Sequence, residues 1–267
     1  QQGGDRQLPR RLMHRLALHQ LSLRDVRPVD LPGIARGVGI DTVSVFVTPP
    51  SADLDIFPRI QTGEVAAFRA ACADHDVTVH NIEVFLLGPD TDVLDFDPAL
   101  DLEALIQDED AGRVGDRLCA LADAAGRRGL RVSVEFMKFS HCRSIGAGAT
   151  LLTRLGHENL SLLVDPLHLF RTGGSVADLR AADPVLIGAA QICDGPMAAP
   201  ESPFGEAVED RGLPGEGEFP LLDFLAALPA DTPIDMEVPM KRFAKAGIAP
   251  ADRAARLVAA TRKLMTR

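Results

Sequence analysis

Apolar and polar residues follow two repeating patterns along this chain. Short, nearly continuous apolar runs are typical of strands buried on both faces, and they alternate with segments whose apolar residues recur at helical spacing. The apolar runs predict strands at 16–21, 42–47, 77–85, 131–137, 160–165, 187–193 and 234–238. The helical spacing predicts helices at 31–37, 62–75, 112–128, 148–155, 176–182, 221–228 and 250–264.

One further stretch, 102–107, is compatible with either a short fourth strand or the start of a helix. Counted as a strand, it brings the set to eight. Strands that alternate with helices favour parallel pairing, and eight of them predict a closed (β/α)8 barrel, which needs about 250 residues. Residues 1–11 are polar and predict a flexible leader, so we expect a single TIM-barrel domain at 12–267.

Four of the predicted strands end in a side chain that carries an oxygen ligand. These are Glu135, Asp165, Gln191 and Glu237. The carboxyl ends of barrel strands surround one cavity, so these side chains should converge. Taken alone, Asp165 could simply cap the next helix, and His168 could be an ordinary packed histidine. Four strands that each end in an oxygen ligand favour a shared site.

Three carboxylates placed together would repel each other at low dielectric, and a bound divalent cation would neutralise most of their charge. Ligation by oxygen alone favours one Mg²⁺ or Mn²⁺ over a structural zinc ion.

Composition narrows the class of partner. The net charge of −10 argues against nucleic acid, because phosphate binding needs a basic surface. No apolar run is long enough to span a membrane, no signal-peptide pattern opens the chain, and the cysteines lack CxxC spacing. We therefore expect a cytoplasmic protein with a small-molecule partner, and we leave a homodimer open.

Five short motifs make the chain resemble a known family. They are VEFM from Val134, VDPLH from Val164, QICDGP from Gln191, RGLPGEG from Arg211 and MEVP from Met236. Their order resembles that of the xylose isomerase-like TIM barrel superfamily, which contains sugar isomerases, ketose 3-epimerases and dehydratases. The resemblance implies that Glu135, Asp165, Gln191 and Glu237 hold the metal and that His168 touches substrate.

Two departures from the family pattern bear on what can be carried over, one at a candidate metal ligand and one on the substrate side of the site. Many ketose 3-epimerases have histidine where this chain has Gln191. The region around 102–110 also looks shortened, as if the helix before the fourth strand were nearly deleted.

The resemblance also implies a chemistry. The metal would stabilise an enediolate formed by proton abstraction beside a carbonyl, with Glu135 and Glu237 as the acid–base pair of an isomerase or epimerase. In a dehydratase, one group abstracts the proton while another, such as His168, protonates the departing hydroxyl.

Three more polar residues are candidate substrate contacts. They are His80, Lys138 and Arg211, although a packed histidine and a solvated loop lysine are plain alternatives for the first two.

The sequence thus predicts a metal-dependent isomerase or epimerase of a keto-sugar or sugar phosphate. Two alternatives stay open at this point. One is a metal-dependent lyase that dehydrates a keto-cyclitol, a 3-keto sugar or 3-dehydroshikimate, and the other is a non-catalytic sugar-binding barrel.

Overall fold

The computed structural model describes residues 14–48, 58–87, 102–106 and 110–267. The predicted leader and the connection between the third and fourth strands, residues 88–101, lie outside these ranges, and so does part of the region predicted to be shortened. No helix in the described ranges combines the length and the apolar character that crossing a bilayer requires.

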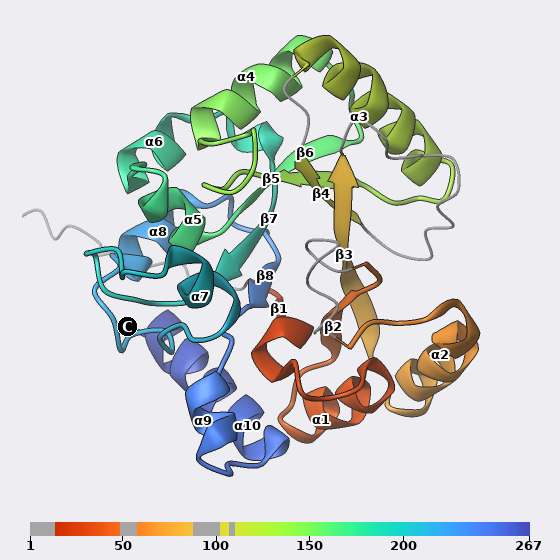
Figure 1. Cartoon of the computed structure of the whole chain (residues 1–267), viewed down its shortest axis with the longest axis vertical. Coiled ribbons are helices and arrows are strands. Elements are labelled where there is room, and N and C mark those ends of the chain that lie inside the picture. Colours follow the sequence, from red (N-terminus) through yellow and green to blue (C-terminus); the bar gives the residue numbers. More distant parts are fainter. Residues whose placement is uncertain (1–13, 49–57, 88–101, 107–109) are drawn as a thin grey trace, which may run out of the picture.

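A parallel barrel occupies the centre of the molecule, with helices arranged around it (Figure 1). The described ranges contain eight strands: β1 (Leu16–His19), β2 (Thr42–Phe46), β3 (Thr78–Leu87), β4 (Leu102–Ile106), β5 (Val132–Glu135), β6 (Leu160–Val164), β7 (Ile187–Ile192) and β8 (Ile234–Met236). Each strand pairs with the next, and β8 pairs with β1 through Leu16, Ala17 and Leu18 to close the ring. The predicted (β/α)8 barrel is confirmed, and the ambiguous stretch at 102–107 is a strand.

The longer helices lie where apolar periodicity predicts them. The helices are α1 (Leu31–Gly37), α2 (Val65–Asp74), α3 (Ala111–Gly126), α4 (Ile145–Leu155), α5 (Pro166–Arg171), α6 (Val176–Ala181), α7 (Pro203–Val208), α8 (Leu221–Ala227), α9 (Lys241–Lys245) and α10 (Pro250–Met265). Of these, α5, α7 and α9 were not predicted. Each is only five or six residues long, so an apolar period is hard to recognise in it, although α6 of the same length was predicted.

The apolar residues form two separate clusters. The larger one includes the outward-facing strand residues and the helix faces that cover them, for example Val132, Leu162 and Leu257. The smaller one comprises Leu21, Phe46, Val84 and Met137. The smaller cluster lies at the end of the barrel where the strands finish, which is also where the polar candidates gather.

The first strand is shorter than predicted for a local reason. It ends at His19, and residues Gln20–Leu23 form a 3-10 helix. The ring of His19 accepts a hydrogen bond from the backbone amide of Leu21 at its Nδ1 atom (3.0 Å), which turns the chain away from the strand direction. His19 is therefore a strand-end residue, and its ring lies beside Glu237.

Candidate metal centre and active site

The four predicted ligands come from consecutive stretches of the barrel wall. Glu135 is the last residue of β5, Asp165 and Glu237 directly follow β6 and β8, and Gln191 is next to last in β7. All four are buried, with 5% or less of each residue exposed. The structure therefore brings together the residues that the strand-end pattern selects.

Asp165 both caps a helix and contributes to the candidate site. Its Oδ1 atom accepts from the backbone amide of Leu167 (2.7 Å) and so caps α5. Its Oδ2 atom accepts a hydrogen bond from Arg211 Nη1 (2.8 Å). The capping bond fixes the carboxylate in orientation and leaves the second oxygen for the site.

The amide of Gln191 lies at the point where the carboxylates converge. One atom of this amide is 3.1 Å from each of Glu135 Oε1, Asp165 Oδ2 and Glu237 Oε2. If that atom is the nitrogen, its two hydrogens face three acceptors. If it is the oxygen, four oxygens face one another, an arrangement that a bound cation or a proton on one carboxylate stabilises.

The donor set fits a divalent metal. The 3.1 Å spacing is close to the separation of about 3 Å between adjacent oxygens around an octahedral Mg²⁺, whose metal–oxygen distances are about 2.1 Å. Three carboxylates face the single guanidinium of Arg211, so two negative charges are left over, which one divalent cation would neutralise.

Arg211 joins the ligand cluster to a covering helix. Its Nη1 donates to Asp165 Oδ2 (2.8 Å) and to Glu237 Oε2 (2.6 Å), while Nε and Nη2 donate to the carbonyl of Ala207 in α7 (3.0 and 2.8 Å). Burial opposes the charge of this guanidinium, yet Glu237 and Asp165 hold the pKa of Arg211 well above its ordinary value. The side chain predicted to contact substrate is thus also the counterion of two candidate ligands, Asp165 and Glu237.

The loop that carries Arg211 is organised by Asp194. The carboxylate of Asp194 accepts from the backbone amides of Gly195 (2.8 Å), Gly215 (2.9 Å) and Phe219 (3.1 Å). A Cβ atom at Gly217 would lie only 2.3 Å from Asp194 Oδ1, so only glycine allows this close approach. These contacts explain the Asp-Gly and glycine-rich parts of the QICDGP and RGLPGEG motifs.

Burial makes the carboxyl group of Glu237 easier to protonate than that of an exposed glutamate. Burial raises the pKa of Glu237 above its ordinary value, and the attraction of Arg211 and of His19 offsets only part of this effect. A carboxylate in such surroundings can carry a proton, which general acid–base chemistry requires.

His168, on α5, lies beside the ligand cluster. Its Nε2 atom is 3.8 Å from Glu135 Oε1 and 3.9 Å from Asp165 Oδ2. Burial lowers the pKa of His168 to about 4, although the charge of Asp165 opposes the shift. The imidazole is therefore neutral near pH 7 and can accept a proton or a hydrogen bond.

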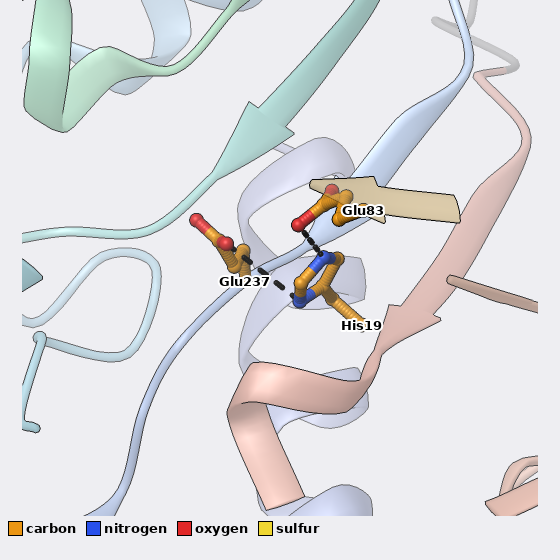
Figure 2. A group of neighbouring side chains, drawn as sticks. All are labelled: His19, Glu83 and Glu237. Atoms are coloured by element: carbon orange, nitrogen blue, oxygen red, sulfur yellow. Dashed lines mark ion pairs between the residues drawn. The ribbon is translucent and has the colours of Figure 1, made fainter. Parts of the chain in front are cut away.

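A second cluster, not predicted from the sequence, consists of His19 and Glu83 beside Glu237 (Figure 2). His19 Nε2 lies 2.8 Å from Glu83 Oε2, and His19 Nδ1 lies 3.6 Å from Glu237 Oε1. Asn81 also donates to Glu83 Oε1 (2.9 Å). Because Nδ1 accepts from the Leu21 amide, Nε2 is the nitrogen that carries the proton toward Glu83. The strand-end pattern would have selected His19 if the first strand had been predicted to end at this residue and not at residue 21.

The two remaining predicted contacts lie apart from the ligand cluster. His80 is near the start of β3, and its Nε2 atom is 3.9 Å from Asp235 Oδ2, two residues before Glu237 on β8. Lys138 is exposed and lines a small separate cavity with Phe139, His168 and Arg171. Neither His80 nor Lys138 lines the cavity above the candidate ligands.

That cavity has a charged floor and an apolar rim. Its charged or ionisable lining consists of Glu83, Glu135, His168, Arg211 and Glu237. The rim includes the small apolar cluster together with Phe139 and Phe204, whose rings meet edge to face at 5.6 Å between centroids. The cavity can therefore hold a small molecule with its polar groups toward the carboxylates.

The match to a protein-family model agrees with this geometry. Residues 98–264 match the model of the xylose isomerase-like TIM barrel. The chain belongs to this family. The matched segment includes β5 to β8 and all four candidate ligands, so the resemblance inferred from the motifs is confirmed.

One curated relative of this xylose isomerase-like barrel is the inosose isomerase of Halalkalibacterium halodurans. The two sequences are 26% identical over 134 residues, and the match covers 49% of this chain and 46% of that protein. The matched region is therefore about half the length of the relative.

Several solved structures share the barrel. A xylose isomerase-like TIM barrel/4-hydroxyphenylpyruvate dioxygenase fusion protein superposes with a TM-score of 0.74 at 22% identity, covering 92% of this chain and 42% of the fusion. The IolI protein, crystallised with a bound zinc atom, gives a TM-score of 0.72 at 15% identity over 94% of this chain and 98% of IolI.

Enzymes of two reaction types are found on the same fold. A D-allulose 3-epimerase from Methylomonas sp. has a TM-score of 0.65 at 15% identity, covering 94% of this chain and 96% of the epimerase. The probable 3-DHS dehydratase AsbF of Bacillus anthracis has a TM-score of 0.67 at 14% identity, covering 96% of this chain and 99% of AsbF. At these identities the likeness establishes the barrel and not the reaction.

Replacing Gln191 with histidine tests whether this position holds a metal in this xylose isomerase-like barrel. Both side chains offer one neutral donor, so if Gln191 is a ligand the Gln191→His protein is expected to bind a divalent metal, with its preference shifted from that of the parent protein toward softer ions such as Zn²⁺. Competition dialysis followed by elemental analysis measures the shift. Complete loss of metal in the variant would show that Gln191 serves another purpose.

Proposed function

We propose that this protein is a divalent-metal-dependent isomerase or epimerase of a small polyhydroxy ketone, such as a sugar or keto-sugar. The observation that carries the proposal is the convergence of Glu135, Asp165 and Glu237 on the amide of Gln191 at the floor of a cavity. The curated relative, an isomerase of inosose, supports the same reaction class.

The proposed ligands are Glu135, Asp165, Gln191 and Glu237, and Mg²⁺ or Mn²⁺ suits their oxygen donors best. When bound, such an ion supplies Lewis-acid stabilisation of negative charge on adjacent substrate oxygens. The chain itself must then supply proton transfer, orientation and a site from which water is excluded.

Proton transfer is assigned to the two glutamates. They stand on β5 and β8, three strands apart in an eight-stranded ring, so they approach the cavity from well-separated directions. Both line the cavity. A substrate held between them would present one face to Glu135 and the other to Glu237, which removal and return of a proton on opposite faces requires.

Orientation of these groups comes from their neighbours. Arg211 holds Glu237 through its Oε2 atom, and His19 stands beside the other oxygen, Oε1, at 3.6 Å. The apolar rim that includes Phe46 and Met137 limits the access of water to the floor. Proton transfer within such a dry cavity is less exposed to exchange with solvent.

A lyase is the second candidate function, and His168 is the observation that favours it. It places a third acid–base side chain at the cavity, separate from the two glutamates. A dehydration needs one group to remove a proton and a second to deliver one to the departing hydroxyl. The pKa of about 4 makes His168 better suited to accept the proton than to donate it at neutral pH.

Elemental analysis and NMR together test the proposed function. Purified protein is expected to bind about one Mg²⁺ or Mn²⁺ per chain, with Mg²⁺ exchanging readily. Incubation with ketoses, inososes and 3-dehydroshikimate in deuterated water then identifies the reaction. Deuterium uptake without loss of water indicates isomerisation or epimerisation, whereas loss of water indicates a lyase. Protein that binds no divalent metal at all would contradict the proposal.

Replacing His168 with alanine separates the two possible ligand sets. His168 Nε2 also lies within reach of an ion held by Glu135 and Asp165, so these three residues form an alternative set. If Gln191 and Glu237 complete the site as proposed, His168→Ala should keep the parent metal affinity, measured by titration calorimetry, and lose only part of its rate. Loss of metal binding would make His168 a ligand and contradict the assignment.

The rates of the same variant separate an epimerase from a lyase. An epimerase that uses two glutamates should tolerate His168→Ala with a moderate loss, while a lyase that uses His168 as acid or base should lose about 10²–10⁴-fold. Single-turnover rates on the substrate found by NMR decide between the two reactions.

A further inference from the structure

A second cavity, of about 270 Å³, lies between the chain that follows β1 and the chain that follows β8. Its lining comes from residues within 22–25, from Met240 and α9, and from α10; both helices are blue in Figure 1. It shares no lining residue with the cavity above the candidate metal ligands. A ligand bound here would therefore occupy a site of its own.

The ionisable side chains around this second cavity are mostly basic. Four of the lining residues are Arg or Lys, and one is Asp. Arg24 donates to a backbone carbonyl of α7 (2.9 Å), and Lys241 donates to Glu209. These two side chains already have partners and add positive potential, whereas Arg253 and Lys245 are placed to bind a ligand directly.

Arg253 is a buried cation with few acceptors around it. Only 2% of the residue is exposed, and its Nη2 atom donates to both carboxylate oxygens of Asp25 (2.8 and 2.6 Å). The Nε atom is buried and has no hydrogen-bond partner among the described residues. A guanidinium has five donor hydrogens, and a buried donor without an acceptor is costly. A ligand that brings several acceptor oxygens to the adjoining cavity would meet this need.

Lys245 brings a second cation to the same cavity. It is exposed, and its ammonium group forms no hydrogen bond or ion pair with the part of the chain that the structure describes. An exposed lysine by itself is ordinary. Here it lines one cavity with the buried guanidinium of Arg253, so that a single anion between α9 and α10 can contact both charges.

The size and chemistry of the second cavity favour a phosphate group. Its volume is slightly below the range of roughly 300–1,000 Å³ for pockets that hold drug-sized ligands, so a small anion suits it. A phosphate ester carries between one and two negative charges at neutral pH and has three acceptor oxygens. The planar guanidinium of Arg253 and the compact ammonium of Lys245 are the groups that proteins commonly use to bind it.

The second cavity lies behind the backbone that carries one of the candidate ligands. Ser22, which lines it, donates through Oγ to the carbonyl of Met236 (2.8 Å) and accepts from the amide of Val238 (2.7 Å). These are the two neighbours of Glu237 in the sequence. An anion in the second cavity would thus contact the support of the candidate metal centre and not the substrate.

We propose that the second cavity binds a phosphate group through Arg253 and Lys245, separately from the substrate of the enzyme. The ligand is inorganic phosphate or the phosphate of a small monoester. This inference does not rest on the proposed isomerase or epimerase function, because it concerns residues outside the candidate active site.

Titration calorimetry of the Mg²⁺-loaded protein with inorganic phosphate tests the inference. We expect saturable binding that Lys245→Gln weakens about tenfold, the usual effect of losing a hydrogen bond to a charged group. Lys263→Gln is the matched control, since Lys263 is an exposed lysine of α10 outside the cavity. The control should keep the parent affinity. Absence of saturable binding, or equal affinity of the parent and Lys245→Gln proteins, would overturn the inference; the second result would place the phosphate elsewhere, for example on the metal.

A variant with the opposite expected effect guards against a loss of binding caused by misfolding. Asp25→Asn removes the one negative charge that lines the second cavity and keeps an oxygen that can accept from Arg253. Phosphate should then bind about fivefold more tightly, because a repulsion of about 1 kcal/mol between neighbouring charges in water is removed. Unchanged or weaker binding to Asp25→Asn would contradict the proposed position of the anion.

Two further compounds identify the source of the phosphate group and test its class. Tighter binding of glycerol 3-phosphate than of inorganic phosphate would indicate a phosphorylated metabolite as the ligand, and the reverse order would indicate free phosphate; both results support the site. Acetate carries a single charge and should bind much more weakly than either. Acetate that binds as tightly as phosphate would show a general anion site and overturn the assignment to phosphate.

Discussion

Glu237→Gln is expected to lower turnover by about 10²–10⁴-fold while the protein still folds, because that is the usual contribution of a positioned acid–base group. Glutamine has the same size, keeps one oxygen for a metal and still accepts a hydrogen bond from Arg211. It cannot take up a proton. The burial that raises the pKa of Glu237 marks this carboxylate as one that can accept and return a proton.

The measurement is the rate of deuterium incorporation into substrate, followed by NMR, alongside metal titration of the same variant. Glu158→Gln is a matched control, because Glu158 is exposed and precedes the start of β6, at the opposite end of that strand from Asp165. We expect the control to keep the parent rate and Glu237→Gln to bind metal more weakly. A Glu237→Gln protein that exchanges deuterium at the parent rate would remove this residue from the acid–base pair.

Arg211→Met is expected to lower the free energy of unfolding of the metal-free protein by about 3–5 kcal/mol, the usual effect of removing one partner from a buried ion pair. Arg211 is 3% exposed and is the partner of two buried carboxylates, Asp165 and Glu237. Methionine fills part of the volume but leaves both carboxylates without this counterion. It also leaves the carbonyl of Ala207 without two of its donors.

Urea unfolding with and without Mn²⁺ measures this effect. A cation that binds only the folded protein should restore part of the lost stability, because it replaces the missing positive charge and adds binding free energy. Arg180→Met serves as the control, since its ion pair with Asp223 is 3.5 Å long and mostly exposed, and such pairs contribute about 0–1 kcal/mol. A loss below 1 kcal/mol for Arg211→Met would show that the carboxylates are neutral or compensated by other groups.

Much of the fold could be predicted from local patterns. The apolar runs located the strands to within a few residues, because strands buried on both faces leave an unbroken apolar signal. Regular alternation with helices was enough to predict parallel pairing and closure. The helices α5, α7 and α9 were missed, because an apolar period is hard to recognise in only five or six residues, although α6 of the same length was predicted.

The four candidate ligands were predictable for the same reason. Each of Glu135, Asp165, Gln191 and Glu237 lies at or just beyond the end of its own strand, so a local pattern is enough to select it. Parallel strands in a closed barrel end on one side, and this rule alone brings the four side chains together.

The contacts across the barrel were decided by tertiary structure alone. His19 is near the start of the chain and Glu237 near its end, and they meet because β8 pairs with β1. Glu83 joins them from β3 by pointing into the barrel. Nothing in the sequence around any one of these residues contains that information, since it arises only when the ring closes.

Arg211 shows the same difference between what a local sequence pattern indicates and what the tertiary structure decides. Its motif marked it as a functional loop residue, and a role in binding substrate followed from that reading alone. The structure places its guanidinium between α7 and two buried carboxylates, a pairing that the motif does not indicate. Local sequence determined which side chains carry charge at the strand ends, whereas the closed barrel decided which charges neutralise one another, because electrostatic pairing depends on distances that only the folded chain sets.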